Sequence, residues 1–291
     1  MTVLVFGRNG QVATALQQQA AASGQTLLAM GHGEVDVLDA QAMRDAVVRS
    51  SAIAVINAAA YTAVDKAESE REAAFALNAE APGLMAGICA EYGLPFVHLS
   101  TDYVFDGSKP APYREVDPLA PLGVYGASKA EGEARVLGAH PQAIVLRTAW
   151  IYFEQGQNFV RTMLRVGRER DEMRIVSDQR GNPTYAADIA DACLAIAGRG
   201  LAPASQSGVF HYAGQGAASW FEFATAIFEE AAGVGRRVPA KLIPIGTVDY
   251  PTPAKRPANS QLDCARLEQE FGIQARPWRE RLQTCIAKVA D

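Results

Sequence analysis

The sequence has few cysteines and no long apolar run, and both absences restrict what the chain can be. Its four cysteines are far apart and lack the spacing of metal ligands: Cys89, Cys193, Cys264 and Cys285. We interpret them as buried thiols of a reducing compartment and predict no metal site. The apolar runs have the length of strands, well short of the ~20 residues that span a bilayer. No basic segment leads into an apolar one near Met1, so we expect no secretory signal, no membrane partner and a cytoplasmic location.

A strong charge of one sign is also missing. The chain has 27 Lys and Arg against 32 Asp and Glu, for a net charge of −5. This mild negative charge gives no attraction to nucleic acid, so we predict no nucleic-acid partner. The 291 residues, 49% of them hydrophobic, suffice for a dinucleotide-binding domain and a smaller second lobe.

The first half of the chain alternates short apolar segments with longer amphipathic or alanine-rich ones. We predict strands at residues 3–6, 26–30, 54–57, 96–100 and 143–147. The helices predicted between them span residues 11–23, 40–50, 70–92 and 125–137. Such alternation, with strands that are apolar throughout, is typical of a parallel sheet buried on both faces. The expected fold class is α/β: a Rossmann-like, doubly wound parallel sheet with a smaller α/β substrate-binding lobe.

The strand–helix rhythm breaks after about Trp150. Helices are predicted at 158–169, 188–197 and 220–232, strands at 174–176 and 208–212, and a proline-rich stretch at 239–257. We predict that residues 1–150 form an NAD(P)-binding Rossmann domain. Residues 151–291 are expected to form mainly the substrate-binding lobe, with residues of about 186–215 packing back on the first domain.

A glycine turn directly follows the first predicted strand and opens the first predicted helix. Gly7, Gly10 and Ala13 form a Gly-x-x-Gly-x-x-Ala pattern in the context where dinucleotides bind. Gly7 allows a tight turn, Gly10 lets the backbone approach a pyrophosphate, and Ala13 lets the helix pack closely. An ordinary strand–helix turn of another α/β protein is the alternative. The expected cofactor contacts here are Gly7, Arg8, Asn9, Gly10, Gln11 and Val12.

The end of the second predicted strand bears on the choice between NADH and NADPH. An NAD-selective site usually has an acid there, which binds the ribose 2′-hydroxyl. Here the strand ends Ala29-Met30-Gly31-His32, without an acid. Arg8 could pair with a 2′-phosphate through its planar guanidinium, or it could be a solvated loop residue. We predict NADPH as the cofactor, with NADH also accepted, and an adenine contact from Asp36 and Val37.

Tyr125 and Lys129 are four residues apart and therefore share one face of a predicted helix. Alone, such a pair is a common half-exposed helix face. A tyrosine with its ordinary pKa near 10 is a poor proton donor at neutral pH, and a nearby ammonium would bring that pKa down. Thr101 follows the fourth predicted strand at the carboxyl edge of the sheet, where its hydroxyl could bind a substrate carbonyl. The third strand ends in small residues, 57–62, against which a cofactor could lie. In this order, the features predict a reductase whose proton donor is Tyr125.

Longer segments resemble the extended short-chain dehydrogenase/reductase superfamily and, within it, the dTDP-4-dehydrorhamnose reductase family. The resemblance runs over nearly the full length. Its motifs are GRNGQV at 7–12, NAAAYTAVDKAES at 57–69, STDYVFDG at 100–107, VYGASK at 124–129, RTAWIY at 147–152, DQRGNPT at 178–184 and RPANSQL at 256–262. The last three are specific to this family. The resemblance implies NAD(P)H-dependent reduction of dTDP-4-dehydro-β-L-rhamnose to dTDP-β-L-rhamnose, a precursor of cell-surface polysaccharide.

The resemblance also implies a role for individual residues. Tyr125 would be the general acid, Lys129 would adjust its pKa, and Thr101 would bind the 4-keto oxygen. Asp102 and Trp150 would contact the sugar, although Trp150 could instead be a core residue under the lobe.

Further implied contacts lie on both sides of the cleft. Arg256 would approach the substrate diphosphate, and Asn259 would bind substrate or only shape its loop. The remaining cofactor contacts would be Met30, Asp36, Val37, Ala58, Ala59, Ala60, Tyr61 and Thr62, together with Tyr125 and Lys129.

One departure from the family concerns magnesium. Some relatives dimerise around Mg²⁺ held by glutamates, and the matching positions here hold Ala15 and Ala187. Alanine offers no oxygen ligand, so we predict no metal in the site and a monomer or weak homodimer. Two other functions stay open. One is reduction of another nucleotide-linked 4-keto-deoxysugar, and the other is a non-catalytic nucleotide-binding role, like that of the methionine adenosyltransferase regulatory subunit.

Overall fold

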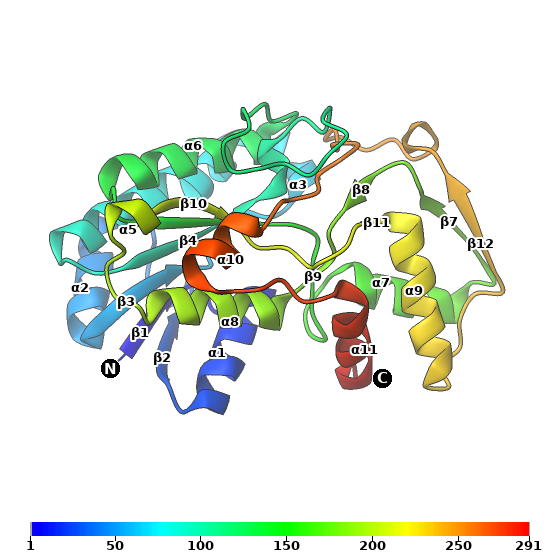
Figure 1. The fold of residues 1–291 in the computed structure, drawn as a ribbon, viewed down its shortest axis with the longest axis horizontal. Coiled ribbons are helices and arrows are strands. Elements are labelled where there is room, and N and C mark those ends of the chain that lie inside the picture. The colour runs from blue at the N-terminus through cyan, green and yellow to red at the C-terminus, as the bar shows by residue number, and fades with distance from the viewer. Residues whose placement is uncertain (1, 291) are drawn as a thin grey trace.

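The computed structural model describes residues 2–290 and is built around a six-stranded parallel sheet (Figure 1). The strand order is β10-β5-β4-β3-β1-β2, and every neighbouring pair is parallel. The strands are β1 (Thr2–Phe6), β2 (Thr26–Met30), β3 (Ala52–Asn57), β4 (Phe96–Thr101), β5 (Ile144–Thr148) and β10 (Gly208–His211). The direction of winding reverses between β1 and β3, so a crevice opens at the carboxyl ends of these strands. The predicted doubly wound α/β class is confirmed.

Alternate side chains of the central strands pack on opposite faces, because successive residues of a strand point to opposite sides. In β1, Val3 and Val5 face the core beneath α1 and α8, whereas Leu4 and Phe6 face the core beneath α2, α5 and α6. The helices are α1 (Gln11–Ser23), α2 (Ala40–Ser50), α5 (Ala81–Glu91), α6 (Val124–Ala139) and α8 (Ala186–Ala197). Apolar side chains therefore pack on both faces of the sheet, as the sequence predicted.

The long helix predicted at 70–92 contains a change of helix type. α4 (Arg71–Phe75) passes into a π-helical turn, η1 (Ala76–Glu80), before α5 begins, and Pro82 lies in the first turn of α5. A π turn accommodates a proline, which lacks the amide hydrogen that an α-helix needs. The stretch Arg71–Glu91 has the length and composition to cross a membrane, but half of its most apolar window is buried inside this fold.

The π turn carries a structural asparagine. The Asn78 side chain accepts from the Tyr61 amide (2.9 Å) and donates to the Tyr61 carbonyl (3.0 Å) and to Ser128 Oγ (3.0 Å). It thereby joins the segment after β3 to α6. Gly132 makes room for this contact, because a Cβ there would lie 1.9 Å from the Asn78 carbonyl oxygen.

The second half of the chain builds a lobe from shorter elements. Two short elements lie in the first half: α3 (Val64–Ala67) follows β3, and a 3₁₀ turn, Asp102–Val104, follows β4. Two further 3₁₀ turns lie later in the chain, at Ala204–Gln206 and Thr247–Asp249. The lobe elements are β6 (Ile151–Tyr152), α7 (Phe159–Glu169), β7 (Glu172–Val176), β8 (Arg180–Gly181), β9 (Thr184–Tyr185), β11 (Ala218–Ser219), α9 (Trp220–Gly233), β12 (Lys241–Ile245), α10 (Ala265–Phe271) and α11 (Trp278–Lys288). α9 begins at a capping box in which Ser219 and Glu222 bind each other's backbone amides.

The lobe shares its hydrophobic core with the sheet. One continuous cluster of buried apolar side chains includes Val3 and Ile56 of the sheet together with Tyr152, Phe223 and Trp278 of the lobe. α8 packs against α1, and β10 pairs with β5, so two segments from late in the chain complete the sheet layer.

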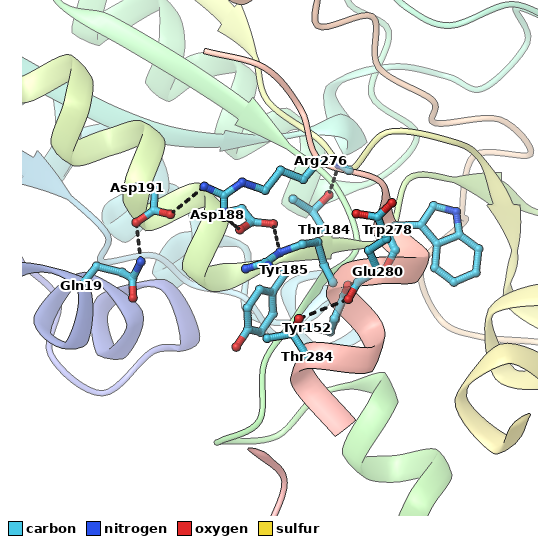
Figure 2. A network of polar contacts seen from close by, with 12 residues as sticks. Gln19, Tyr152, Thr184, Tyr185, Asp188, Asp191, Arg276, Trp278, Glu280 and Thr284 are labelled. Carbon is cyan, nitrogen blue, oxygen red and sulfur yellow. Dashed lines mark hydrogen bonds and ion pairs between the residues drawn. The ribbon is translucent and has the colours of Figure 1, made fainter. Parts of the chain in front are cut away.

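A polar network fastens the C-terminal segment to α8 (Figure 2). The buried carboxylate of Asp188 accepts from Arg276 Nη1 (3.0 Å) and from Arg281 Nε (2.9 Å). Asp191, one turn later, accepts from Gln19 of α1. The Tyr152 hydroxyl donates to the carbonyl of Trp278 at 3.1 Å, where α11 begins. The chain end is thus tied both to the sheet layer and to the lobe.

Candidate active site

A cavity of about 390 Å³ lies at the carboxyl ends of the sheet strands. Its walls come from the glycine turn, the segments after β3 and β4, the start of α6, and the segment after β5. Among the predicted site residues, the cavity contacts Asn9, Gly10, Gln11, Val12, Ala58, Ala60, Thr62, Thr101, Asp102, Tyr125, Lys129 and Trp150. A larger cavity of about 550 Å³ lies between residues 213–217 and 261–265, and its lining contains none of them. The predicted site residues therefore identify the cavity of about 390 Å³ as the candidate active site.

Three buried side-chain oxygens without a hydrogen-bond partner among residues 2–290 belong to residues that line this one cavity. They are Gln11 Oε1, Asp102 Oδ2 and Thr148 Oγ1. A buried polar atom without a partner is unfavourable, so such atoms indicate where a polar ligand binds. Gln11 and Asp102 were predicted as site residues, whereas Thr148 was missed. Thr148 pairs with Thr101 in the register of β4 and β5, but within an apolar strand pattern a threonine gives no signal of its own.

The glycine turn has the geometry that a close backbone approach requires. Gly7 has φ +108°, and a Cβ there would lie 2.8 Å from the Ala58 carbonyl carbon and the Ala59 nitrogen. Gly10 is the N-cap of α1, and a Cβ there would meet no atom of the described residues within 4 Å. Ala13 is buried. The start of α1 therefore borders the cavity, with residues 9–12 in its lining.

Arg8 forms an ion pair with Glu34, and this corrects the sequence interpretation of β2. The chain turns after Met30, with Glu34 N and Val35 N both bonded to the Gly31 carbonyl, and this brings Glu34 back to the strand end. An acid therefore does stand beside the glycine turn. Hydrogen bonds from the Gly31 amide and from Arg8 hold the pKa of Glu34 below its ordinary value. Glu34 lies four residues after the end of β2, beyond the strand end where an NAD-selective site has its acid.

The other predicted adenine-side residues lie outside the cavity lining. The Met30 carbonyl accepts from the Gly7 amide at 2.8 Å, which joins β2 to the glycine turn. The exposed Asp36 carboxylate accepts from the Leu38 amide, and Val37 is half-buried against the core.

Some residues of the segment after β3 line the cavity, and others hold the segment in place. Ala58, Ala60 and Thr62 contact the cavity, and the Ala59 amide donates to Asn57 Oδ1 at 3.0 Å. The Tyr61 hydroxyl donates to the Glu70 carboxylate at 2.6 Å, a bond that raises the pKa of Tyr61 to about 12. The Tyr61 ring therefore points to the exposed Glu70.

Thr101, Tyr125 and Lys129 come together at the cavity as predicted, on the end of β4 and the first two turns of α6. Gly126 lets α6 approach this strand end, because a Cβ there would lie 2.1 Å from the Tyr103 carbonyl oxygen. The rings of Tyr103 and Tyr125 meet edge to face at 5.6 Å. The Thr101 hydroxyl donates to Asp102 Oδ1 at 3.0 Å and accepts from the Tyr103 amide.

The pKa values of both α6 residues depart from their ordinary values. Burial raises the pKa of Tyr125 to about 12, opposed by its contact with Thr101, whereas the sequence led us to expect a lowered value. The expectation was wrong because it counted the lysine charge and not the desolvation of the phenolate. Burial lowers the pKa of Lys129 to about 8, and Glu133 opposes this. The Lys129 ammonium donates to the Leu99 carbonyl at 2.6 Å.

On the sugar side, Asp102 and Trp150 both contact the cavity. Burial raises the pKa of Asp102 to about 6. Trp150 has φ +45°, in the left-handed region, and its half-buried indole stacks on that of Trp220 with 3.5 Å between ring centroids. Gly181 lies against this indole, since a Cβ there would be 2.5 Å from it. Trp150 therefore lines the cavity with part of its surface and packs against the hydrophobic core with the rest.

Arg256 and Asn259 lie on the loop beyond the cavity lining. Arg256 forms a two-pronged ion pair with Asp65 of α3, at 2.8 and 2.7 Å. Because Val64 beside it contacts the cavity, this pair stands near the cavity rim. The Asn259 side-chain amide donates to the carbonyls of Lys109 and Ala111. These bonds fit the second of the two roles expected for Asn259, that of shaping its loop. Asp65 is a further residue that the sequence did not single out.

The positions compared with magnesium-binding glutamates lie in the interior. Ala15 and Ala187 are buried, on helices α1 and α8, which pack against each other. Residues 2–290 contain no group of three or more His, Cys, Asp or Glu side chains that could hold a metal ion.

The family model described as the RmlD substrate binding domain matches residues 1–291. The dTDP-4-dehydrorhamnose reductase of Sinorhizobium fredii is 44% identical over 289 residues, which cover 98% of this chain and 97% of that protein. A crystal structure of dTDP-4-dehydrorhamnose reductase from Bacillus anthracis in complex with NADP has a TM-score of 0.91 and 33% identity, with 99% of each chain covered. The corresponding crystal structure from Clostridium acetobutylicum has a TM-score of 0.91 and 35% identity, again over 99% of each chain.

Proposed function

This chain belongs to the RmlD substrate-binding family, and from that membership we propose how its cavity residues divide the work of reducing a 4-keto sugar. The chain is an NAD(P)H-dependent oxidoreductase that reduces dTDP-4-dehydrorhamnose in dTDP-rhamnose biosynthesis. The observation that carries our assignment of the site is the lining of this cavity. Thr101, Tyr125 and Lys129 line it, together with three residues whose buried side-chain oxygens have no hydrogen-bond partner among residues 2–290.

Tyr125 is the proton donor in this proposal. When bound, the nicotinamide supplies the hydride. With a pKa of about 12, the Tyr125 phenol stays protonated at neutral pH and can donate to the sugar oxygen as negative charge develops on it. Thr101 donates a second hydrogen bond to the same oxygen after its one hydroxyl hydrogen has turned away from Asp102 Oδ1. Lys129 bonds the cofactor ribose and restores the proton that Tyr125 gives up.

The substrate is held by groups of different chemistry. We assign the unpartnered Oδ2 of Asp102 to a sugar hydroxyl and the indole of Trp150 to an apolar face of the ring. Arg256 would approach the diphosphate from the rim, where Asp65 holds its guanidinium in place. Asn259 acts on substrate only through the shape of its loop.

The dinucleotide lies along the glycine turn in this proposal, with contacts from residues 7–12 and 58–62. NADPH is preferred and NADH is also used, because Arg8 suits the 2′-phosphate of NADPH and Glu34 suits the 2′-hydroxyl of NADH. A 2′-phosphate would take the Arg8 guanidinium from Glu34. A free 2′-hydroxyl would donate to the Glu34 carboxylate.

We place the enzyme in the cytoplasm as a monomer or weak homodimer, with a dTDP-sugar as its small-molecule partner and without a nucleic-acid or membrane partner. Residues 1–150, with about 186–215, form the cofactor-binding part, and the rest of 151–291 forms the substrate lobe. Size-exclusion chromatography with light scattering, with Mg²⁺ and with EDTA, tests the oligomeric state. A dimer that dissociates only in EDTA would contradict it.

The experiment that tests the function starts from dTDP-glucose with the enzymes that convert it to the 4-keto sugar. Oxidation of NADPH or NADH at 340 nm then reports turnover, and product formation identifies the sugar. We expect turnover with both cofactors and a higher kcat/KM with NADPH. Comparison with a second nucleotide-linked 4-keto-deoxysugar separates the substrates. Absence of turnover with any of them would favour the non-catalytic alternative.

A further inference from the structure

His98 is a buried histidine beside the catalytic lysine, and the mechanism above leaves it without a role. It lies in β4, three residues before Thr101, and is 0% exposed. Its Nε2 is 3.5 Å from Lys129 Nζ, and its Nδ1 is 3.0 Å from Asn57 Nδ2. The imidazole thus stands between the end of β3 and the functional face of α6.

The surroundings of His98 fix which of its nitrogens carries the proton. Asn57 Oδ1 accepts from the Ala59 amide at 3.0 Å, so the Asn57 NH₂ group faces the imidazole and donates to Nδ1. A ring nitrogen that accepts a hydrogen bond carries no proton. Burial, together with the charge of Lys129, lowers the pKa of His98 well below its ordinary value, so the ring is neutral. Its single proton is therefore on Nε2, directed at Lys129.

We propose that His98 is a positioning residue that acts through Lys129, by stabilising the neutral amine left after Lys129 returns a proton to Tyr125. The inference rests on the proposed function, since it needs Tyr125 as the proton donor. One proton moves from the Lys129 ammonium to the Tyr125 phenolate oxygen. The lone pair then exposed on Nζ accepts a hydrogen bond from His98 Nε2–H. An ammonium has no lone pair and cannot accept this bond, so His98 favours the neutral amine alone.

The charged groups around Lys129 agree with this direction of transfer. Glu133, on the same helix, favours the ammonium, but its carboxylate is already bound by Arg147 of β5 at 2.9 and 2.6 Å. The pKa of Lys129, about 8, lies below that of Tyr125, about 12, so the proton moves downhill to the phenolate. Asp102, which faces Tyr125, raises the pKa of Tyr125 further.

The test compares pH profiles of kcat for the wild type, His98→Asn and a control. An asparagine at 98 can still accept from Asn57 but is too short to reach Lys129. In the wild type, activity falls as pH rises through the Lys129 pKa, because a neutral Lys129 has no proton to return to the Tyr125 phenolate. In His98→Asn this alkaline limb should move up by about half to one pH unit, since one neutral hydrogen bond to the amine is lost. The Kd for NADPH should stay within about twofold.

The control is His140→Asn, a buried histidine at the end of α6 that bonds the Leu94 carbonyl at 2.9 Å and should leave the pH profile unchanged. A second measurement needs no variant at position 98. ¹⁵N spectra of the four histidines, assigned by replacing the other three in turn, report the tautomer in the wild-type chain. We expect a neutral His98 ring protonated on Nε2 at pH 7. An Nδ1-protonated or charged ring, or an unmoved alkaline limb in folded His98→Asn, overturns the inference. Absence of turnover in the wild type refutes the proposed function instead and leaves the tautomer to be measured.

Discussion

The two walls of the active-site cavity are held in place by different means. One wall, with Thr101, Tyr125 and Lys129, lies on β4 and α6, and we call it the catalytic wall after the proposed roles of these residues. Gly126 lets α6 approach the turn after β4, and Gly132 lets it approach the π turn η1. The sugar wall lies on loops, where Trp150 is held by stacking and a strained φ, and Arg256, at the rim beyond the lining, is held by an ion pair. Atoms that exchange a proton need exact placement, which regular elements provide. Groups that only recognise a sugar nucleotide tolerate placement by loops.

The largest effect should come from the catalytic wall. Tyr125→Phe removes the proton donor and leaves the ring in place. We expect kcat to fall by about 100- to 10,000-fold, the usual contribution of a general acid. The Kd for NADPH, measured by fluorescence titration, should change little. Undiminished turnover in the folded variant would remove Tyr125 from its assigned role.

The packing of α6 gives the next largest effect. In Gly126→Ala, the new Cβ would lie 2.1 Å from the Tyr103 carbonyl oxygen, so the helix must shift away from Thr101. We expect the free energy of unfolding to fall by about 1–3 kcal/mol, together with a loss of kcat. Gly138→Ala is the matched control, since a Cβ there meets no atom of the described residues within 4 Å. That variant should be unchanged or more stable by up to about 1 kcal/mol in denaturant titrations. Equal stability of the two variants would contradict tight packing at Gly126.

A smaller effect is expected from the sugar wall. Arg256→Lys keeps the positive charge but loses the planar fork that grips Asp65. The pair is partly exposed, so its loss should raise KM for the sugar nucleotide by about two- to fivefold. We expect kcat and the KM for NADPH to stay near their wild-type values. A loss confined to kcat would show that Arg256 acts on the chemical step, and that the two walls are less distinct than we infer.

The smallest effect concerns the choice of cofactor. Glu34→Gln removes the carboxylate that competes for Arg8 and that would bind a ribose 2′-hydroxyl. The ratio of kcat/KM for NADPH over NADH should rise by up to about fivefold, as fits an exposed ion pair. Glu91→Gln, which breaks the Arg44–Glu91 surface pair on α2 and α5, is the control and should leave the ratio unchanged. A ratio that falls in Glu34→Gln would contradict the assignment.

The sequence predicted the regular part of the molecule and less of the rest. Residues 11–23, 26–30 and 40–50 were predicted with the bounds that the structure has, because their apolar periodicity is unbroken. The β12 strand was hidden in a proline-rich stretch, and α10 has only seven residues, so neither gives a periodic signal. α11 was missed although it is eleven residues long. The change of helix type at 76–80 depends on Pro82 and on the contacts of Asn78, which only the fold brings together.

The same distinction applies to the site. That Thr101, Tyr125 and Lys129 line one cavity could be predicted, because the spacing of the last two on a helix and the place of Thr101 after a strand follow from the sequence. Glu34, Asp65 and Thr148 could not be predicted from the sequence. Glu34 and Asp65 matter because of the arginines that the fold places beside them, and Thr148 because its buried hydroxyl has no hydrogen-bond partner among residues 2–290. The pKa of Tyr125 was predicted in the wrong direction for the same reason. Charge can be read from the sequence, and burial cannot.

The late arrival of β10 and α8 has a consequence for how the chain is made. β10 supplies the sheet edge next to β5, and α8 covers the face shared with α1. Until residue 211 has left the ribosome, the nascent chain exposes an unpaired strand edge and an apolar sheet face, which are the features that make partly folded chains aggregate. A fragment that stops at residue 150 keeps both surfaces permanently. Synthesis therefore has to run past two thirds of the chain before the six-stranded sheet is complete, and a chain that stalls earlier exposes surfaces that chaperones bind.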